Sequence, residues 1–220
     1  YVTAVGDEGG FAPSFTSDIE PLEMIMKAMV NTNMDDVFVL ALDVAASQIY
    51  DAKHNTYRIH EKDLSVDKLI DFYKKLSKDY PLYSIEDGMA EDDIAGWQKL
   101  KKSLGSELQL VGDDVFATNE KRILEGVQAD IANAVIIKPN QIGTVTETLQ
   151  AIELCNNQNL NVIISHRSGE TNDSFIVDLA VGTSVGQIKI GGLCRGERMA
   201  KYNRLLAIEE LLTFASLDEE

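Results

Sequence analysis

Residues 82–87 read LYSIED, residues 108–114 read LQLVGDD and residues 134–140 read AVIIKPN. Each stretch is a short run of mostly aliphatic residues that ends on charged or polar side chains, which is typical of a buried parallel strand leaving the core at its carboxyl end. Longer amphipathic segments separate these runs. The alternation predicts consecutive βα units that feed one parallel sheet.

The same alternation extends in both directions along the 220 residues, which we treat as one domain, 1–220. Further strands are predicted at 2–5 (VTAV), 37–44 (VFVLALDV), 161–166 (NVIISH) and 186–191 (GQIKIG). Residues 50–59 predict a surface hairpin inserted after the strand at 37–44. Helices are predicted at residues 21–30, 66–78, 94–104, 121–127, 144–156, 174–181 and 198–212.

From the strand at 37–44 onward, every predicted strand ends on one ionisable residue. From the second of these residues on, they follow one another at steps of 27, 25, 28 and 23 residues, the length of one βα unit. Right-handed crossovers place the carboxyl ends of parallel strands on one face, so these side chains should converge at the mouth of an α/β barrel. In chain order they are Asp43, Glu86, Asp113, Lys138, His166 and Lys189.

Three carboxylates come first in this series. Crowded at one mouth, Asp43, Glu86 and Asp113 would repel one another by about 4 kcal/mol per pair at ~4 Å and an effective dielectric constant of ~20. A divalent cation would remove this cost, and an all-oxygen ligand set favours a hard ion such as Mg²⁺. The alternative is that each charge only ends its strand in a solvated loop.

Two lysines and a histidine complete the series. Lys138 follows four apolar residues, and partial desolvation beside a metal and a second lysine would disfavour its ammonium form, which makes it the candidate general base. The alternative is that Lys138 and Lys189 only neutralise the carboxylates. His166 lies in SHRSGE, where it could hold a phosphate together with Arg167, Ser168 and backbone amides.

The composition limits the partners and the compartment. A formal net charge of −16 argues against nucleic acid and anionic membranes as partners. The sequence shows no membrane span and no signal peptide, and two cysteines are too few for a disulfide framework, so we expect a cytoplasmic protein. The chain starts at Tyr1 without a methionine, as an excised piece would.

Five short motifs stand out along the chain: GDEGGFAP at 6–13, SIED at 84–87, GDD at 112–114, KPNQIGT at 138–144 and SHRSGET at 165–171. Together they closely resemble the motifs of the enolase family in its bacterial-like form. The resemblance continues through GQIK at 186–189 and RMAKYNRLLAIEE at 198–210, so it covers essentially the whole chain and corresponds to the C-terminal half of a member. It implies an α/β fold, an enolase-type TIM (β/α)8 barrel that is incomplete at its N-terminal end, without the first strand and the N-terminal α+β domain.

The resemblance implies a glycolytic lyase that reversibly dehydrates 2-phosphoglycerate to phosphoenolpyruvate with Mg²⁺ as its cofactor. Asp43, Glu86 and Asp113 would hold the magnesium ion. Lys138 would take the proton from the carbon beside the substrate carboxylate, and Lys189 would help stabilise the enolate-like intermediate.

The remaining roles come from two loops. By resemblance, Glu8 in GDEGG would help the hydroxyl leave as water. Arg167 and Ser168 would bind the substrate phosphate, and His166 would line the substrate site. Other members of the wider superfamily usually lack the SHRSGE and GDEGG motifs, and they are the less favoured assignment.

The resemblance also bears on partners and location. We expect a homo-oligomer, a dimer or higher, because a partial barrel leaves strand edges uncovered. Enolases also occur at cell surfaces or are secreted without a signal peptide, where they bind host proteins. The alternatives to an active enzyme are therefore a surface-binding protein and a non-catalytic fragment that binds metal without turnover.

Overall fold

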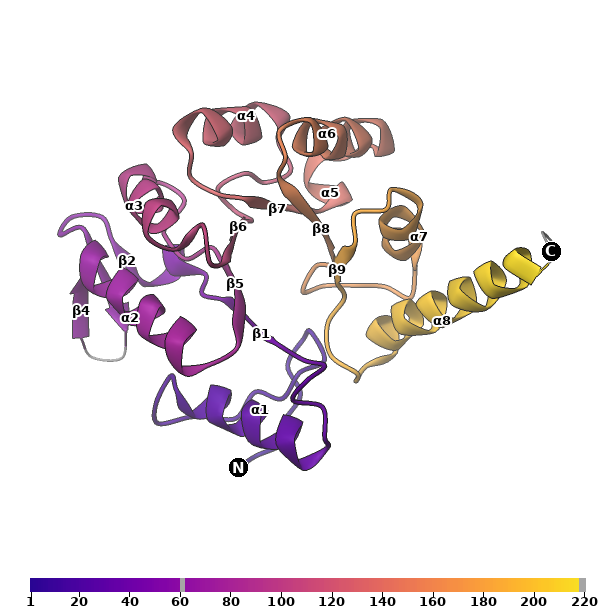
Figure 1. Ribbon diagram of the computed structural model, residues 1–220, viewed down its shortest axis with the longest axis horizontal. Helices are drawn as coiled ribbons and strands as arrows, with labels where there is room; N and C mark the ends of the chain where they lie inside the picture. Colours follow the sequence, from indigo (N-terminus) through magenta and orange to yellow (C-terminus); the bar gives the residue numbers. More distant parts are fainter. Residues whose placement is uncertain (60–61, 218–220) are drawn as a thin grey trace.

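The computed structural model describes residues 1–59 and 62–217. Its centre is a parallel six-stranded sheet in the order β1-β5-β6-β7-β8-β9, so strand order follows chain order. Figure 1 shows the sheet curling into an arc with most helices on its outer side, which confirms the predicted incomplete α/β barrel. The strands are β1 (Leu40–Asp43), β5 (Leu82–Glu86), β6 (Gln109–Gly112), β7 (Ala134–Ile137), β8 (Asn161–Ser165) and β9 (Gln187–Lys189).

Helices connect successive strands of this sheet, and every predicted helix is confirmed with small shifts at its ends. A short helix that the sequence did not predict, α5, directly follows Lys138. The helices are α1 (Glu20–Asn31), α2 (Val66–Asp79), α3 (Ile94–Leu104), α4 (Glu120–Ala129), α5 (Pro139–Ile142), α6 (Val145–Asn157), α7 (Phe175–Gly182) and α8 (Gly196–Leu217), with a 3₁₀ turn η1 at Ala46–Ile49.

The predicted hairpin at 50–59 is confirmed as part of a small antiparallel sheet. It consists of β2 (Tyr50–Asp51), β3 (Thr56–Ile59) and β4 (Lys62–Ser65). Tyr57 anchors it, because this fully buried side chain donates its hydroxyl proton to Asp93 (2.7 Å) and accepts the backbone N–H of Ala90 (3.1 Å). The hairpin is thereby fixed to the loop that follows β5.

The strand predicted at residues 2–5 is wrong. Only Val5 pairs there, in an isolated bridge to Phe11, while Tyr1 and Val2 are 70% and 72% exposed. A strand needs a neighbour for its backbone N–H and C=O groups, and in the described residues this segment joins neither of the two sheets. Its apolar residues alone do not make a strand.

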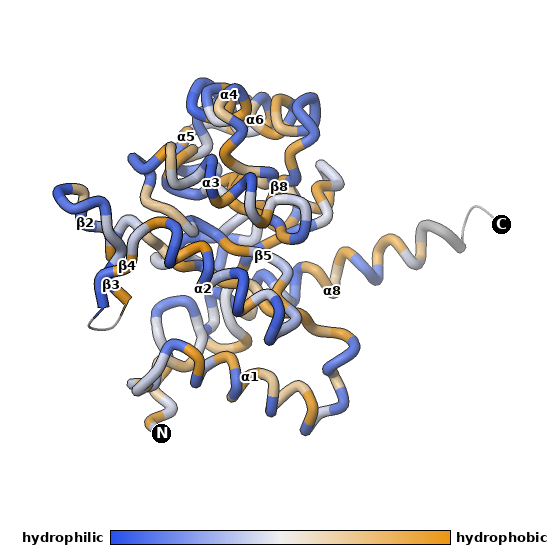
Figure 2. The backbone as a smooth tube through the Cα atoms, turned by 60° about the vertical axis from the view of Figure 1, so that its left-hand side comes forward, coloured by the Kyte–Doolittle hydropathy of each residue, from blue (hydrophilic) through white to orange (hydrophobic). Residues whose placement is uncertain are grey.

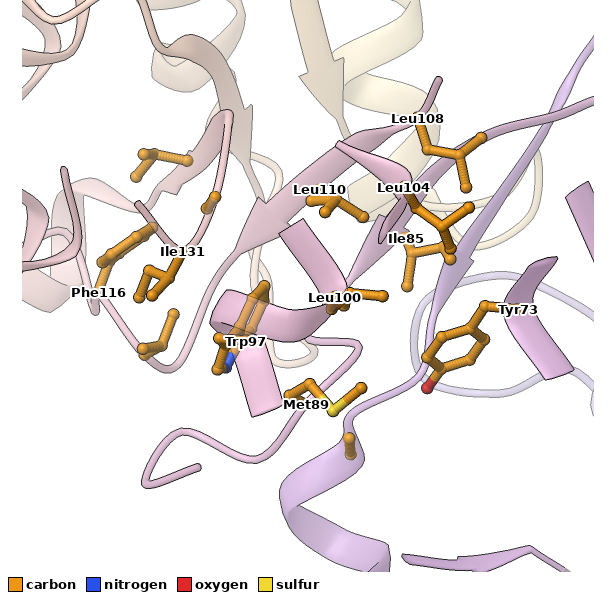
Figure 3. Close-up of a cluster of buried hydrophobic side chains, with 14 of the residues drawn as sticks. Tyr73, Ile85, Met89, Trp97, Leu100, Leu104, Leu108, Leu110, Phe116 and Ile131 are labelled. Atoms are coloured by element: carbon orange, nitrogen blue, oxygen red, sulfur yellow. The ribbon is translucent and has the colours of Figure 1, made fainter. Parts of the chain in front are cut away.

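Apolar side chains lie on both faces of the sheet. The outer face of the sheet and the helices together form the main core. This core includes Trp97 and Leu100 of α3 and Phe116 of the segment after β6, as Figure 3 shows. A second cluster of four buried residues, Val111, Ala134, Ile136 and Ile163, is separate from it. Along β7 the two clusters take alternate residues, which is the period of two expected for a strand buried on both faces.

Helix α8 ends the described chain and extends away from the rest of the molecule, as Figures 1 and 2 show. Its first turns contact the barrel through Arg198 and Lys201, which are fully buried. Its later turns expose Leu206, Leu211 and Leu212. None of the helices in the described ranges combines the length and the apolar character needed to cross a bilayer.

Candidate active site

The six predicted strand-end residues all lie at the carboxyl ends of the strands. Asp43 and Glu86 are the last residues of β1 and β5 and are paired in register, and Lys189 is the last residue of β9. Asp113, Lys138 and His166 directly follow β6, β7 and β8. The shared position places one set of ionisable groups at one end of the half-barrel.

Lys189 connects the two edges of the sheet. Its Nζ donates to Glu86 Oε1 at 2.7 Å and to Asp43 Oδ2 at 3.0 Å. Because β9 is one edge of the sheet and β1 is the other, these ion pairs span the inside of the arc. The curvature of the sheet thus brings residues from its two ends into contact.

Asp113 and Lys138 form a second ion pair. Lys138 Nζ lies 2.5 Å from Asp113 Oδ2, and the two side chains are 12% and 9% exposed. The other carboxylate oxygen, Asp113 Oδ1, is buried and has no hydrogen-bond partner among the residues that the structure describes. A buried carboxylate oxygen that accepts no hydrogen bond is well suited to coordinate a cation.

Asp87 fixes the position of this carboxylate through the backbone. It accepts the backbone N–H groups of Asp113 at 2.9 Å and of Asp114 at 3.0 Å. Carboxylate oxygens of Asp87, Asp113 and Asp114 lie within 4.8 Å of one another and form a group that could hold a metal ion. Asp113 therefore belongs to both the predicted ligand set and this second set.

The donor chemistry of the mouth fits a hard divalent cation. Every candidate ligand is a carboxylate oxygen, and the cations that contact the three predicted ligands are the ammonium groups of Lys138 and Lys189. Oxygen donors of this kind suit Mg²⁺. A bound ion would compete with the lysines for the same carboxylates.

Burial shapes the electrostatics of the mouth. It raises the pKa of Glu86 to about 8, against the opposing effect of Lys189, and it raises the pKa of Asp87 to about 7. Burial acts to lower the pKa of Lys189, but Glu86 and Asp43 outweigh it and raise that pKa above its ordinary value. The mouth thus favours cations and penalises uncompensated negative charge.

The GDEGG loop lies against the segment after β9. The N–H of Gly192 donates to the carbonyl of Glu8 at 2.7 Å, and a Cβ on Gly192 would lie 2.3 Å from the Gly9 carbonyl oxygen. Gly9 itself has a φ of +81°, which disfavours other residues. The two glycines permit the contact that holds Glu8 in place.

The SHRSGE loop contacts Glu8 directly. Ser168 Oγ donates to Glu8 Oε1 at 3.0 Å, and His166 Nε2 lies 3.5 Å from Glu8 Oε2. Arg167 donates from Nη1 to Asn140 Oδ1 at 3.0 Å. Glu8 therefore contacts the histidine loop, whereas Lys138 contacts Asp113 on another part of the mouth.

The sequence interpretation missed three residues of the site. Asp87 and Asp114 are the second acids of SIED and GDD, and two adjacent acids after a strand were a usable signal. Arg198, which contacts both loops from the start of α8, gave no such signal. Its role depends on contacts with residues that are 30, 31 and 191 positions away in the sequence.

Taken together, the fold and the site define an α/β-barrel protein with a carboxylate and lysine cluster at the carboxyl ends of its strands. A family model described as "Enolase, C-terminal TIM barrel domain" matches residues 1–217. The chain belongs to the enolase family.

Curated relatives agree with this assignment. The chain is 52% identical to the enolase of Campylobacter lari over 209 residues, which is 95% of this chain and 50% of that protein. It is 50% identical to the enolase of Ehrlichia chaffeensis over 217 residues, 98% of this chain and 51% of that protein. It is also 50% identical to the enolase of Helicobacter pylori over 214 residues, 96% of this chain and 50% of that protein. The chain thus spans about half the length of the curated relatives it matches.

Proposed function

We propose that this chain is the catalytic barrel portion of an enolase, a lyase that reversibly dehydrates 2-phosphoglycerate to phosphoenolpyruvate. The observation that carries the proposal is the pairing of Lys138 and Lys189 with three strand-end carboxylates at one mouth. Proton abstraction next to a carboxylate needs a base and a concentration of positive charge. Lys138 would be the base, and Lys189 together with a metal ion held by the carboxylates would supply the charge.

Asp43, Glu86 and Asp113 would hold Mg²⁺, with Asp87 keeping Asp113 in place. When bound, the ion supplies positive charge that stabilises the negative charge developing on the substrate. Sites of the enolase superfamily are already known to combine a lysine or histidine base with one or two magnesium ions. The assignment of these roles to residues of this chain is the proposal.

The chain's own residues would divide the reaction between two sides of the site. Lys138 would remove the proton from carbon, and Lys189 would stabilise the resulting charge. Glu8 would assist departure of the hydroxyl as water, supported by its contact with Ser168. Arg167 and Ser168 would bind the phosphate, for which a guanidinium is well suited.

The second candidate is a metal-binding barrel fragment without turnover of its own. The incomplete barrel favours this candidate: β1 and β9 are open edges, and their outward backbone groups have no strand partner in the described residues. On this basis we propose that the chain alone binds magnesium weakly, turns over poorly and associates with a second copy. A cytoplasmic location agrees with its two free cysteines.

The test measures turnover of 2-phosphoglycerate in the presence of Mg²⁺, monitored through the ultraviolet absorbance of the enol product. It compares this chain with a hybrid that adds the N-terminal half of the Campylobacter lari enolase. Lys138→Ala should lower the activity of the hybrid by about 10²–10⁴-fold, as expected for loss of a general base. Lys121→Ala, a change at an exposed lysine on α4, is the matched control.

An active hybrid that Lys138→Ala inactivates supports both the reaction and the base. A folded hybrid that binds magnesium but forms no product refutes the enzymatic proposal and leaves the metal-binding fragment in its place.

A further inference from the structure

Arg198 is a fully buried cation whose guanidinium hydrogen bonds go to neutral groups. Its Nη1 contacts His166 Nδ1 at 2.7 Å and the carbonyl of Arg167 at 2.8 Å. Its Nη2 donates to the carbonyls of Asp7 and Ser168, both at 2.7 Å. The side chain is 0% exposed, and the nearest carboxylate oxygen in the described part of the chain, on Glu197, is 3.8 Å from Nε.

We propose that Arg198 is a positioning residue that fixes His166 as the neutral tautomer carrying its proton on Nε2, and so makes His166 a hydrogen-bond donor toward Glu8. The argument starts from the 2.7 Å contact between Nη1 and Nδ1. A guanidinium has donors and no acceptor, and it stays protonated in proteins. His166 Nδ1 must therefore be the acceptor, and a neutral imidazole with a bare Nδ1 has its proton on Nε2.

The same contact disfavours the doubly protonated imidazolium. A proton on Nδ1 would place two donors against each other inside the protein. Burial lowers the pKa of His166, Arg198 and Lys189 lower it further, and Glu8 and Glu170 oppose them. The balance favours the neutral ring that the geometry requires.

The proton on Nε2 faces the candidate active site. His166 has a side chain that is 1% exposed. Within residues 1–59 and 62–217 its Nε2 has no hydrogen-bond partner, although Glu8 Oε2 is only 3.5 Å away. Glu8, His166 and Lys189 line the same open cavity of about 480 Å³. A buried N–H without an acceptor costs free energy, so this donor is suited to Glu8 Oε2 after a small movement of that side chain, or to a ligand oxygen that enters the cavity.

Arg198 also holds the two loops that bring these groups together. Its bond to Asp7 fixes the GDEGG loop, and its bonds to Arg167 and Ser168 fix the SHRSGE loop. A purely structural role would end with these backbone contacts. The contact with Nδ1 predicts a specific state of His166, and that state is directly measurable.

The decisive measurement is the ¹⁵N spectrum of the histidine side chains in the 220-residue chain, which has three histidines. His166→Gln assigns the signal. In the wild-type chain Nδ1 should be of the unprotonated, pyridine type and Nε2 of the protonated type. The signal should stay unchanged from about pH 5 to 8, the range in which an ordinary histidine titrates. His54, which is exposed, is the internal reference that titrates.

A protonated Nδ1 in the wild-type chain overturns the proposal. Arg198→Met should release the tautomer, giving a mixed or titrating His166, and an unchanged signal in a folded Arg198→Met chain also overturns it. Arg198→Lys is the second variant if Met prevents folding, because a lysine cannot make all four bonds at once. Arg195→Met, a change at a partly exposed arginine on the same turn, should leave His166 unaltered.

An activity measurement extends the test and rests on the proposed function. In the hybrid with the N-terminal half, Arg198→Lys should lower kcat by about 10- to 100-fold with little change in KM, as for a residue that orients a catalytic group. If the hybrid is inactive, the proposed function fails, and the tautomer measurement still decides the role of Arg198.

Discussion

Replacing Lys189 by methionine should expose the electrostatic cost of the carboxylates at the mouth. Methionine keeps most of the unbranched apolar chain and removes the charged Nζ that contacts Asp43 and Glu86. Removing one partner of a buried ion pair costs about 3–5 kcal/mol. Here Lys189 is 28% and Asp43 is 44% exposed, and Glu86 can take up a proton, so we expect a loss of about 2–3 kcal/mol.

Urea unfolding at about pH 9 with a chelator measures this loss, because Glu86, with its pKa of about 8, is then a carboxylate in the wild type. Millimolar Mg²⁺ should restore much of the stability of Lys189→Met while changing the wild type less, because the ion then supplies the missing positive charge. Adding Glu86→Gln to Lys189→Met should also recover part of it. Lys99→Met removes an exposed ion pair with Asp67 and should cost no more than about 0.5 kcal/mol.

The reasoning is refuted if Lys189→Met is as stable as Lys99→Met in the chelator. It is refuted equally if magnesium stabilises the variant and the wild type by the same amount, since the lysine would then not stand in for a cation at this site.

Three further outcomes are expected. The pKa of Glu86 rises on folding from 4.5 to about 8, so the stability it contributes is complete below pH 4.5 and is lost as the pH rises through 8. Between these pH values, Glu86 should therefore lower the unfolding free energy of the metal-free chain by at most about 1.4 kcal/mol per pH unit. A steeper pH dependence of stability in Glu86→Gln than in the wild type would contradict this expectation. Tyr57→Phe removes the hydrogen bond to buried Asp93 and should lower the free energy of urea unfolding by about 1–3 kcal/mol. An unchanged unfolding midpoint would show that this anchor of the hairpin contributes nothing to stability. Gly112→Ala places a Cβ 2.4 Å from the Phe116 ring. We therefore expect the unfolding free energy to fall by about 1–3 kcal/mol and calorimetry to show weaker Mg²⁺ binding. A variant with wild-type stability and affinity would mean that the ring moves freely.

The strands and the residues at their ends could be predicted from the sequence because both follow local rules. A buried parallel strand reads as an aliphatic run, and the steps between Glu86, Asp113 and Lys138 match one βα unit each. These rules predict which residues lie at the mouth of the barrel. The roles of Asp43, Glu86, Asp113, Lys138 and Glu8 stay predictions.

Partners across the barrel could not be predicted in the same way. The reach of Lys189 to Asp43 depends on how strongly the sheet curves, and no local pattern encodes that curvature. The burial of Arg198 depends on two loops that meet only in the folded chain. The failed strand at 2–5 has a related cause, because strand formation depends on a neighbour that the local sequence does not reveal.

The coincidence of strand order and chain order has a consequence for how the protein folds. Each strand of the central sheet pairs with the next one along the chain, so forming the sheet closes only short loops, at a small entropic cost per step. The contacts that assemble the mouth are far less local: Lys189 and Asp43 are 146 residues apart, and Arg198 and Asp7 are 191 apart. We therefore expect the sheet, which is built from local steps, to form first, and the site to take its geometry later, when the two ends of the sheet come together.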